Sequence, residues 1–172
     1  VQTCALPISA PSLKPAQEKK IIEAAKALIR KIDYVGVLCV EFFVLKSGDI
    51  VANEIAPRPH NSGHYTMDAC ISSQFEQQVR SMARLPLGDT RLLAPVSMLN
   101  LLGDLWFEGS SDQAQEPAWN KVLAHPDAKL HLYGKSDPRM GRKMGHINCL
   151  GEALNEARQN CTAVATELGI EP

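Results

Sequence analysis

A short hairpin pattern constrains this chain more than any other feature, because it sets two carboxylates opposite each other. Residues 37–45 are rich in β-branched and aromatic side chains, residues 50–55 continue this character, and a turn cluster lies between them at 46–49. With the turn centred on Ser47 and Gly48, the predicted pairs are Leu45 with Ile50, Phe43 with Ala52, and Glu41 with Glu54. Like charges that are directly opposed destabilise a sheet. The pattern therefore predicts a cation between Glu41 and Glu54.

Magnesium is the natural cation for such a pair. Mg²⁺ takes oxygen ligands, commonly one or two carboxylates together with substrate phosphates. The sequence leaves two alternatives open. A turn centred on Gly48 and Asp49 would pair Glu54 with Phe43 and separate the carboxylates, and two solvated glutamates on an exposed sheet face would need no ion.

The hairpin leads directly into a polar loop with the sequence NEIAPRPHNSGHYT, over residues 53–66. The loop carries the guanidinium of Arg58, the imidazoles of His60 and His64, a phenol and a glycine. Histidines in a tight loop often serve only as hydrogen-bond partners, and Asn53 could be an ordinary edge-strand residue. The residues alone do not decide between a functional and a purely structural role.

A second charged group lies in the connection that precedes the last predicted strand. It combines four cations and three glycines: Lys135, Arg139, Arg142 and Lys143 with Gly134, Gly141 and Gly145. Glycine allows a close backbone approach, and the arginine fork matches phosphate oxygens in a bidentate way. The connection is a candidate phosphate site, although a basic turn is often just a solvated loop. It has neither a Walker motif nor a GxGxxG sequence, so no P-loop or Rossmann site is predicted.

Hydrophobic periodicity indicates an α+β fold. The predicted helices and strands outside the hairpin are a helix at 15–32, a helix at 67–84 with Thr66 as its N-cap, a strand at 95–102, a short helix at 117–123, strands at 129–133 and 143–149, and a terminal helix at 152–168. No internal repeat is visible.

Composition excludes several classes of protein. The net charge of -1 and a pI near 6.6 give no sign of a nucleic-acid or anionic-membrane partner. No apolar run approaches the roughly 20 residues that span a bilayer. Five cysteines without a CxxC pair argue against a disulfide framework or a structural zinc site. We therefore expect a cytoplasmic protein.

The stretch 34–103 closely resembles the 5-(carboxyamino)imidazole ribonucleotide synthase family of ATP-grasp enzymes. The residues that carry this resemblance are Glu41, the NEIAPRPHNSGHYT segment, SQFE at 73–76 and LPLG at 85–88. Two later segments, HLYGK at 131–135 and RMGRKMGH at 139–146, are similar to the carboxy-terminal domain of the same family. The likeness covers nearly everything from about Pro11 onward.

This resemblance implies a domain organisation. Residues 10–94 would be the carboxy-terminal part of an ATP-grasp domain, an antiparallel sheet with helices, and residues 95–172 a small β-rich domain with a terminal helix. Residues 1–9 resemble an in-frame translation of a sequencing-adapter oligonucleotide, so we expect a non-native leader there. Full-length members begin with a nucleotide-fold domain and an ATP-holding lid that have no counterpart in this sequence. The fragment alone is therefore expected to lack turnover.

The resemblance also implies an activity. Members of the family use MgATP and bicarbonate to carboxylate 5-aminoimidazole ribonucleotide in purine biosynthesis, through carboxyphosphate, and the full-length proteins form homodimers. Family positions correspond to Glu41 and Glu54 as Mg²⁺ ligands, to Asn53 and Glu54 beside ATP, to Arg58 and His60 near bicarbonate and the substrate amine, and to Lys135 and Arg142, with Arg139 as a weaker match, at the ribonucleotide phosphate or the reactive centre.

Two other functions remain open at this stage. A different ATP-grasp carboxylate–amine ligase, such as a formate-using or biotin-dependent relative, would keep the paired glutamates but would not need the basic connection in this form. A non-catalytic binding or assembly module would leave Glu41 and Glu54 merely exposed.

Overall fold

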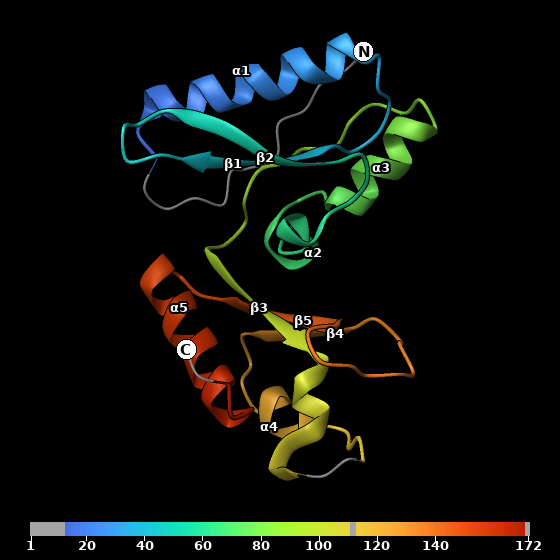
Figure 1. The fold of residues 1–172 in the computed structure, drawn as a ribbon, viewed down its shortest axis with the longest axis vertical. Coiled ribbons are helices and arrows are strands. Elements are labelled where there is room, and N and C mark those ends of the chain that lie inside the picture. The colour runs from blue at the N-terminus through green and yellow to red at the C-terminus, as the bar shows by residue number, and fades with distance from the viewer. Residues whose placement is uncertain (1–12, 111–112, 171–172) are drawn as a thin grey trace. The chain divides into compact units, whose positions relative to one another are not determined.

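The computed structural model describes residues 13–110 and 113–170, and its chain divides into two compact units (Figure 1). Unit 1 ends at Leu93 and unit 2 begins at Ala94. The mixture of helices and antiparallel strands confirms the α+β fold class. The expected leader over residues 1–9 lies outside the described residues.

Unit 1 opens with helix α1, Pro15–Lys31, as the periodicity predicts. Pro15 fits the first turn because its missing N–H would be unpaired there in any case. The side chain of Gln17 accepts a hydrogen bond from the backbone N–H of Lys14 at 3.1 Å, which caps the start of the helix. The same side chain donates to the carbonyl of Gly48 at 3.3 Å, so α1 lies along the hairpin and contacts its turn (Figure 1).

The hairpin consists of β1, Cys39–Val44, and β2, Ile50–Ala56, paired antiparallel. The predicted pairing of Glu41 with Glu54 is confirmed. The two predicted pairs nearer the turn are wrong, because the observed partners are Val44 with Ile50 and Phe42 with Ala52. The turn is longer than two residues, with Leu45 N–H donating to the carbonyl of Asp49, and a β-bulge between Glu41 and Phe42 restores the expected register.

The helix predicted over 67–84 is wrong in its extent. The structure has a short 3₁₀ turn η1, Asn61–Gly63, then α2, Thr66–Ala69, and a separate α3, Gln74–Met82. Thr66 lies in the first turn of α2 rather than at its N-cap, and the side chain of Ser73 caps α3 instead. The helix breaks at Cys70 because its backbone forms a β-bridge with Leu92, a contact from a distant segment that helical periodicity cannot reveal.

Unit 2 is a three-stranded antiparallel sheet in the order β3-β5-β4. Its elements are β3 Val96–Leu102, η2 Gly103–Ser110, α4 Trp119–Leu123, β4 Ala128–Leu132, β5 Lys143–Leu150 and α5 Leu154–Glu167. The central strand β5 is buried from Met144 to Cys149. Helices α4 and α5 complete an apolar core of Leu101, Val122, Ala128, Ile147, Cys149, Val164 and Leu168. The short helix and the terminal helix were both predicted, whereas η2 was not.

Within residues 13–110 and 113–170, no helix combines the length and the apolar character that crossing a bilayer requires.

Candidate functional site

The two strands of the hairpin set the carboxylates of Glu41 and Glu54 against each other, as cross-strand partners. Burial raises the pKa of the Cys39 thiol, its hydrogen bond with Ser62 lowers it, and the charges of Glu41 and Glu54 raise it further. Both carboxylates therefore lie within electrostatic reach of one sulfur atom. As directly opposed cross-strand partners, the two side chains lie on the same face of the hairpin, as a shared ion requires.

The bulge in the hairpin positions this pair. The pairing register of β1 with β2 changes by one residue between Phe42, which pairs with Ala52, and Glu41, which pairs with Glu54. Asn53 is the extra residue on β2. Without the extra residue, the register near the turn would place Glu41 opposite Asn53. Bulges of this kind commonly re-aim side chains beside functional sites.

Opposed carboxylates fit a hard cation on chemical grounds. Glu41 is half-buried and Glu54 is exposed, so the pair opens toward solvent. Mg²⁺ requires oxygen ligands and usually retains several waters, which an exposed pair of carboxylates permits. The residues present therefore fit Mg²⁺, with Glu41 and Glu54 as the ligands that would hold it.

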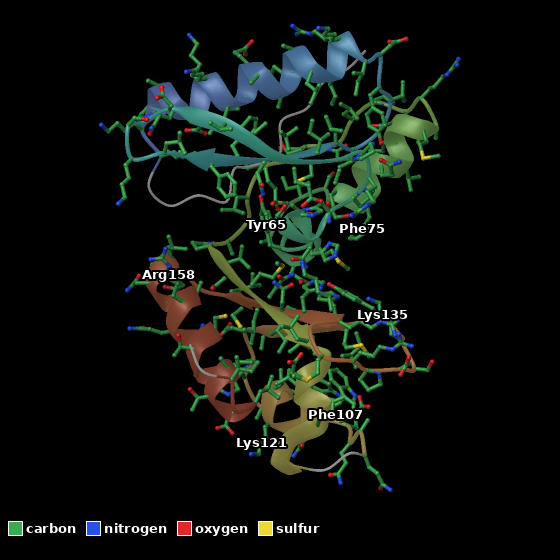
Figure 2. The ribbon with its side chains drawn as sticks, in the orientation of Figure 1. Tyr65, Phe75, Phe107, Lys121, Lys135 and Arg158 are labelled. Atoms are coloured by element: carbon green, nitrogen blue, oxygen red, sulfur yellow. The ribbon has the colours of Figure 1, made fainter. Side chains whose placement is uncertain are left out.

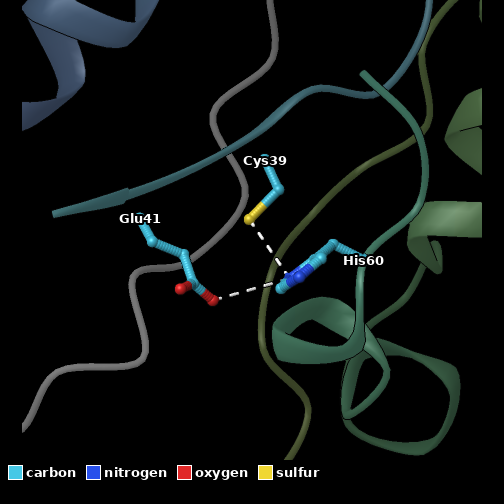
Figure 3. A group of neighbouring side chains, drawn as sticks. All are labelled: Cys39, Glu41 and His60. Carbon is cyan, nitrogen blue, oxygen red and sulfur yellow. Dashed lines mark hydrogen bonds and ion pairs between the residues drawn. The ribbon is translucent and has the colours of Figure 1, made fainter. Parts of the chain in front are cut away.

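His60 lies beside the same pair, at the start of η1 (Figure 3). Its Nδ1 atom is 3.7 Å from the Oε1 of Glu41 and 3.5 Å from the Sγ of Cys39. The backbone N–H of Ser62 donates to this nitrogen at 3.3 Å, and the hydroxyl of Ser62 lies 2.8 Å from it. The loop after β2 thus returns a histidine to the strand that carries Glu41.

The buried side chain of Gln74 holds this loop in place. Its Oε1 accepts from the backbone N–H of His60 at 2.9 Å, and its Nε2 lies 2.8 Å from the His60 carbonyl and 2.7 Å from Nδ1 of His64. Gly63 is required here, because a Cβ at that position would approach Oε1 of Gln74 to 2.5 Å. The backbone N–H of Gln74 donates to the hydroxyl of Thr66 at 2.9 Å, which ties α3 to α2.

Arg58 is exposed, and its Nη1 donates to the carbonyl of Pro59 at 3.0 Å. Tyr34 anchors the backbone just before it, by donating from its hydroxyl to the carbonyl of Pro57 at 2.8 Å. Arg58 also acts on Cys39, whose pKa is raised chiefly by burial and lowered in part by this guanidinium. The structure therefore brings together Glu41, Glu54 and His60, and it places Arg58 on the loop that carries His60.

The basic connection forms a separate cluster in unit 2, where Lys135 extends from the segment after β4 (Figure 2). Its ammonium donates to the carbonyl of Lys143 and lies 5.4 Å from the centroid of the Tyr133 ring. The guanidinium of Arg139 donates from Nε to Oδ2 of Asp137 at 2.8 Å, and Arg142 donates from Nη1 to the Asp137 carbonyl at 2.6 Å. Asp137 thus partly neutralises the two arginines of the candidate phosphate site.

The connection packs closely on the end of β3. A Cβ at Gly103 would approach the backbone oxygen of Arg139 to 2.2 Å, so only glycine fits there. The backbone N–H of Gly103 donates to the carbonyl of Arg142 at 2.8 Å, and that of Gly141 donates to Oδ2 of Asp104 at 2.7 Å. These contacts hold the backbone of the basic connection while leaving Lys135 and Arg139 exposed.

Two family models match the chain, one in each unit. The ATP-grasp domain matches residues 2–75, and the phosphoribosylaminoimidazole carboxylase C-terminal domain matches residues 96–160. The N5-carboxyaminoimidazole ribonucleotide synthase of Brucella melitensis is 52% identical over 124 residues, which cover 72% of this chain and 32% of that protein. The synthase of Bacillus subtilis is 43% identical over 145 residues, which cover 84% of this chain and 36% of that protein. This chain belongs to the N5-carboxyaminoimidazole ribonucleotide synthase family.

Solved structures of the synthase family agree with this assignment. The synthetase from Thermus thermophilus is 36% identical, with a TM-score of 0.81, and the match covers 95% of this chain and 42% of that one. The Aspergillus clavatus synthase, solved in complex with ADP and 5-aminoimidazole ribonucleotide, is 33% identical with a TM-score of 0.81, over 93% of this chain and 42% of that one. The chain spans about a third of the length of the curated synthases from B. melitensis and B. subtilis.

Sequence reasoning missed three residues of the two candidate sites. Cys39 lies in an apolar strand, which is typical of a core residue, yet it is half-buried and contacts both His60 and Ser62. Its place two residues before Glu41 on one strand was the available signal, since such residues share a face. Gln74 and Asp137 had no comparable signal, because their roles depend on contacts with segments elsewhere in the chain or on the fold of a loop.

Proposed function

We propose that this chain supplies binding and catalytic residues of an enzyme that uses ATP and bicarbonate to convert 5-aminoimidazole ribonucleotide to its N5-carboxy form, in purine biosynthesis. The observation that carries the proposal is the Glu41–Glu54 pair with His60 beside it, on the loop that also carries Arg58. Membership of the synthase family supports the choice of reaction. The reaction would form a C–N bond at the exocyclic amine, with ADP and phosphate as co-products.

Unit 1 would bind the nucleotide and the bicarbonate. Glu41 and Glu54 would hold Mg²⁺, which neutralises phosphate charge when it is bound with ATP, and Asn53 would contact the nucleotide next to Glu54. Arg58 is a permanent cation on an exposed loop, suited to the bicarbonate-derived anion. The loop contacts of Gln74 would keep His60 in place for hydrogen bonding to that anion or to the substrate amine.

Unit 2 would bind the ribonucleotide. Lys135 and Arg142 are the proposed contacts to its phosphate or to the reacting groups, and Arg139 is a further candidate. Both arginines donate to Asp137, so they are aimed at an acidic acceptor, and an arriving phosphate would compete with Asp137 for them. Arg142 is more shielded than Arg139, with side-chain exposures of 38% and 73%, so Arg142 has the more fixed position.

The proposed reaction is tested by ADP release that depends on both 5-aminoimidazole ribonucleotide and bicarbonate. We expect no turnover from the 172-residue chain alone, because it spans about a third of its curated relatives. A graft in which this chain replaces the corresponding segment of the B. subtilis synthase should be active. Robust turnover by the isolated chain would contradict the first expectation, and an inactive but folded graft would contradict the second.

Substitutions in the graft test the assigned residues. Glu54→Gln removes one carboxylate while keeping the shape of the side chain, and we expect at least about a 100-fold loss of activity. Glu23→Gln is the matched control, since Glu23 is an exposed glutamate on α1 that forms an ion pair with Lys26. Release of ADP with other amines or with formate in place of bicarbonate would instead favour a different ATP-grasp ligase.

We also propose Mg²⁺ dependence, a homodimeric full-length enzyme and a cytoplasmic location. The first is supported by the carboxylate pair, and the other two by family resemblance and by the absence of CxxC pairs from the sequence. Removal of Mg²⁺ with a chelator should abolish activity, and sedimentation of the full-length protein should give the mass of two subunits.

A further inference from the structure

Three potential metal ligands of different chemical kinds meet beside the hairpin. They are the thiol of Cys39, the carboxylate of Glu41 and the imidazole of His60, and their ligand atoms all lie within 4.8 Å of one another. Cys39 and Glu41 extend from the same face of β1 toward His60, which the loop after β2 brings back (Figure 3). The side chain of His60 is more shielded than that of Glu41, with exposures of 12% and 37%.

The spacing of these atoms fits a tetrahedral ion. Zinc binds thiolate sulfur at about 2.3 Å and imidazole nitrogen or carboxylate oxygen at about 2.0–2.2 Å, so ligands around one tetrahedral Zn²⁺ lie about 3.3–3.6 Å apart. The observed separations from Nδ1 of His60 are 3.5 Å to the Cys39 sulfur and 3.7 Å to the Glu41 oxygen. The sulfur of Cys39 and the carboxylate of Glu41 lie within 4.8 Å of each other, so rotation of these two side chains on β1 would bring all three ligands to one ion.

The hydrogen bonding of His60 supports the same conclusion. The backbone N–H of Ser62 donates to Nδ1 at 3.3 Å, so this nitrogen acts as an acceptor there, as a metal ligand must. In this arrangement two acceptors, Nδ1 of His60 and Oε1 of Glu41, lie 3.7 Å apart, beyond hydrogen-bonding distance. A cation bound to both atoms would resolve this unfavourable approach.

We propose that Cys39, Glu41 and His60 form a binding site for a thiophilic divalent cation such as Zn²⁺, which shares Glu41 with the Glu41–Glu54 pair but does not use Glu54. Sulfur and imidazole nitrogen select such ions, whereas Mg²⁺ prefers oxygen. Three protein ligands leave the fourth tetrahedral position for water or for the hydroxyl of Ser62, which lies 3.3 Å from the sulfur. On binding, the thiol of Cys39 releases its proton to the solvent and the sulfur bonds to the ion.

Cobalt(II) titration of the complete 172-residue chain tests this site, because Co²⁺ replaces Zn²⁺ and reports its ligands by absorption. We expect one equivalent of Co²⁺ to give a thiolate-to-metal charge-transfer band together with the ligand-field bands of tetrahedral cobalt. Zn²⁺ should displace the cobalt and bleach both. Zn²⁺ affinity is then measured by competition with a chromophoric chelator.

Matched variants identify the ligands. Cys39→Ala should abolish the charge-transfer band and weaken Zn²⁺ binding by at least about 100-fold, more than the usual effect of an outer-shell residue. Cys161→Ser is the thiol control, since Cys161 is also half-buried but lies in unit 2, and it should leave the band unchanged. Ser62→Ala should retain the band, because the hydroxyl is not one of the three ligands.

Glu54→Gln separates this inference from the proposed function. It should abolish carboxylation in the graft while leaving the cobalt spectrum of the chain intact, since Glu54 is not a ligand of the proposed site. A charge-transfer band that survives Cys39→Ala, or that disappears with Cys161→Ser, would overturn the proposal. Equal Zn²⁺ affinity of the wild-type chain and Cys39→Ala would also overturn it, provided that thermal unfolding curves show both proteins to be folded.

Discussion

The two units of this chain are stabilised by different means. Unit 2 has an apolar core built on β5, and Leu101, Ile147 and Val164 are fully buried in it. In unit 1 the buried residues around the loop include polar side chains, namely Thr66, Ser72, Gln74 and Gln77, while most of β2 is exposed. A two-stranded hairpin is marginally stable by itself. The candidate site of unit 1, around Glu41 and Glu54, is therefore held largely by hydrogen bonds. The candidate phosphate site of unit 2 is attached to an apolar core.

The largest effect is expected from Ile147→Ala in the core of unit 2. Removing this fully buried side chain leaves a cavity and should lower the free energy of unfolding by about 2–5 kcal/mol. Denaturant unfolding followed by tryptophan fluorescence measures it, since both tryptophans, Trp106 and Trp119, lie in unit 2. Leu123→Ala, at 63% exposure, is the control and should change stability by less than about 0.5 kcal/mol. Equal losses from both variants would contradict the picture of a packed core.

Gln74→Leu should give the corresponding effect in unit 1. The substitution leaves the backbone groups of His60 without their partners, at a cost of about 1–3 kcal/mol for each buried group. Amide hydrogen exchange of residues 60–66 should accelerate, while the tryptophan-monitored transition of unit 2 stays unchanged. Gln159→Leu on the exposed face of α5 is the control. Loss of the unit 2 transition with Gln74→Leu would show that the units are not stabilised separately.

Thiol reactivity compares one half-buried cysteine from each unit. In unit 2, a hydrogen bond from Cys149 and another from Ser97 lower the pKa of Cys161, whereas burial and nearby carboxylates raise the pKa of Cys39. A lower pKa means more thiolate at neutral pH, and the thiolate is the nucleophile. Iodoacetamide should therefore label Cys161 several-fold faster than Cys39 at pH 7, and the rate for Cys39 should keep rising into more alkaline solution. Mass spectrometry of the labelled peptides measures both, and the reverse order would contradict the assigned shifts.

The smallest stability effect is expected from Asp137→Ala in the basic connection. Its ion pairs with Arg139 and Arg142 are exposed, so the loss should stay below about 1 kcal/mol. The freed guanidinium groups should bind inorganic phosphate several-fold more tightly, as calorimetry can measure. Asp127→Ala, an exposed aspartate elsewhere in unit 2, is the control. Weaker phosphate binding by Asp137→Ala would show that the carboxylate organises the site instead of competing for it.

The hairpin illustrates how far local pattern can be trusted. Alternation and the turn cluster located both strands, and the pairing of Glu41 with Glu54 is as predicted. The predicted two-residue turn is wrong, however, and the correct pair arises because the longer turn and the bulge offset each other. A bulge carries no reliable signal in one sequence, since it reflects how strand twist and neighbouring contacts are accommodated.

The helix predicted over 67–84 failed for a related reason. Its apolar residues recur at helical spacing, but Cys70 pairs with Leu92 and Ser73 supplies a new cap, so the chain breaks between α2 and α3. That break positions Gln74 at the start of α3, where it reaches back to His60. The most important support of the loop thus follows from a contact between distant segments.

The sequence by itself determined the α+β class, the family, the opposed glutamates and the two clusters of charged residues, because these follow from side-chain chemistry and short-range spacing. Only the tertiary structure decided that Cys39 and His60 meet beside Glu41, that Gln74 holds the loop, and that Asp137 neutralises the arginines. Contacts of this kind depend on where folding brings separate segments, and on how a loop closes on itself. The order of residues along the chain does not specify those distances.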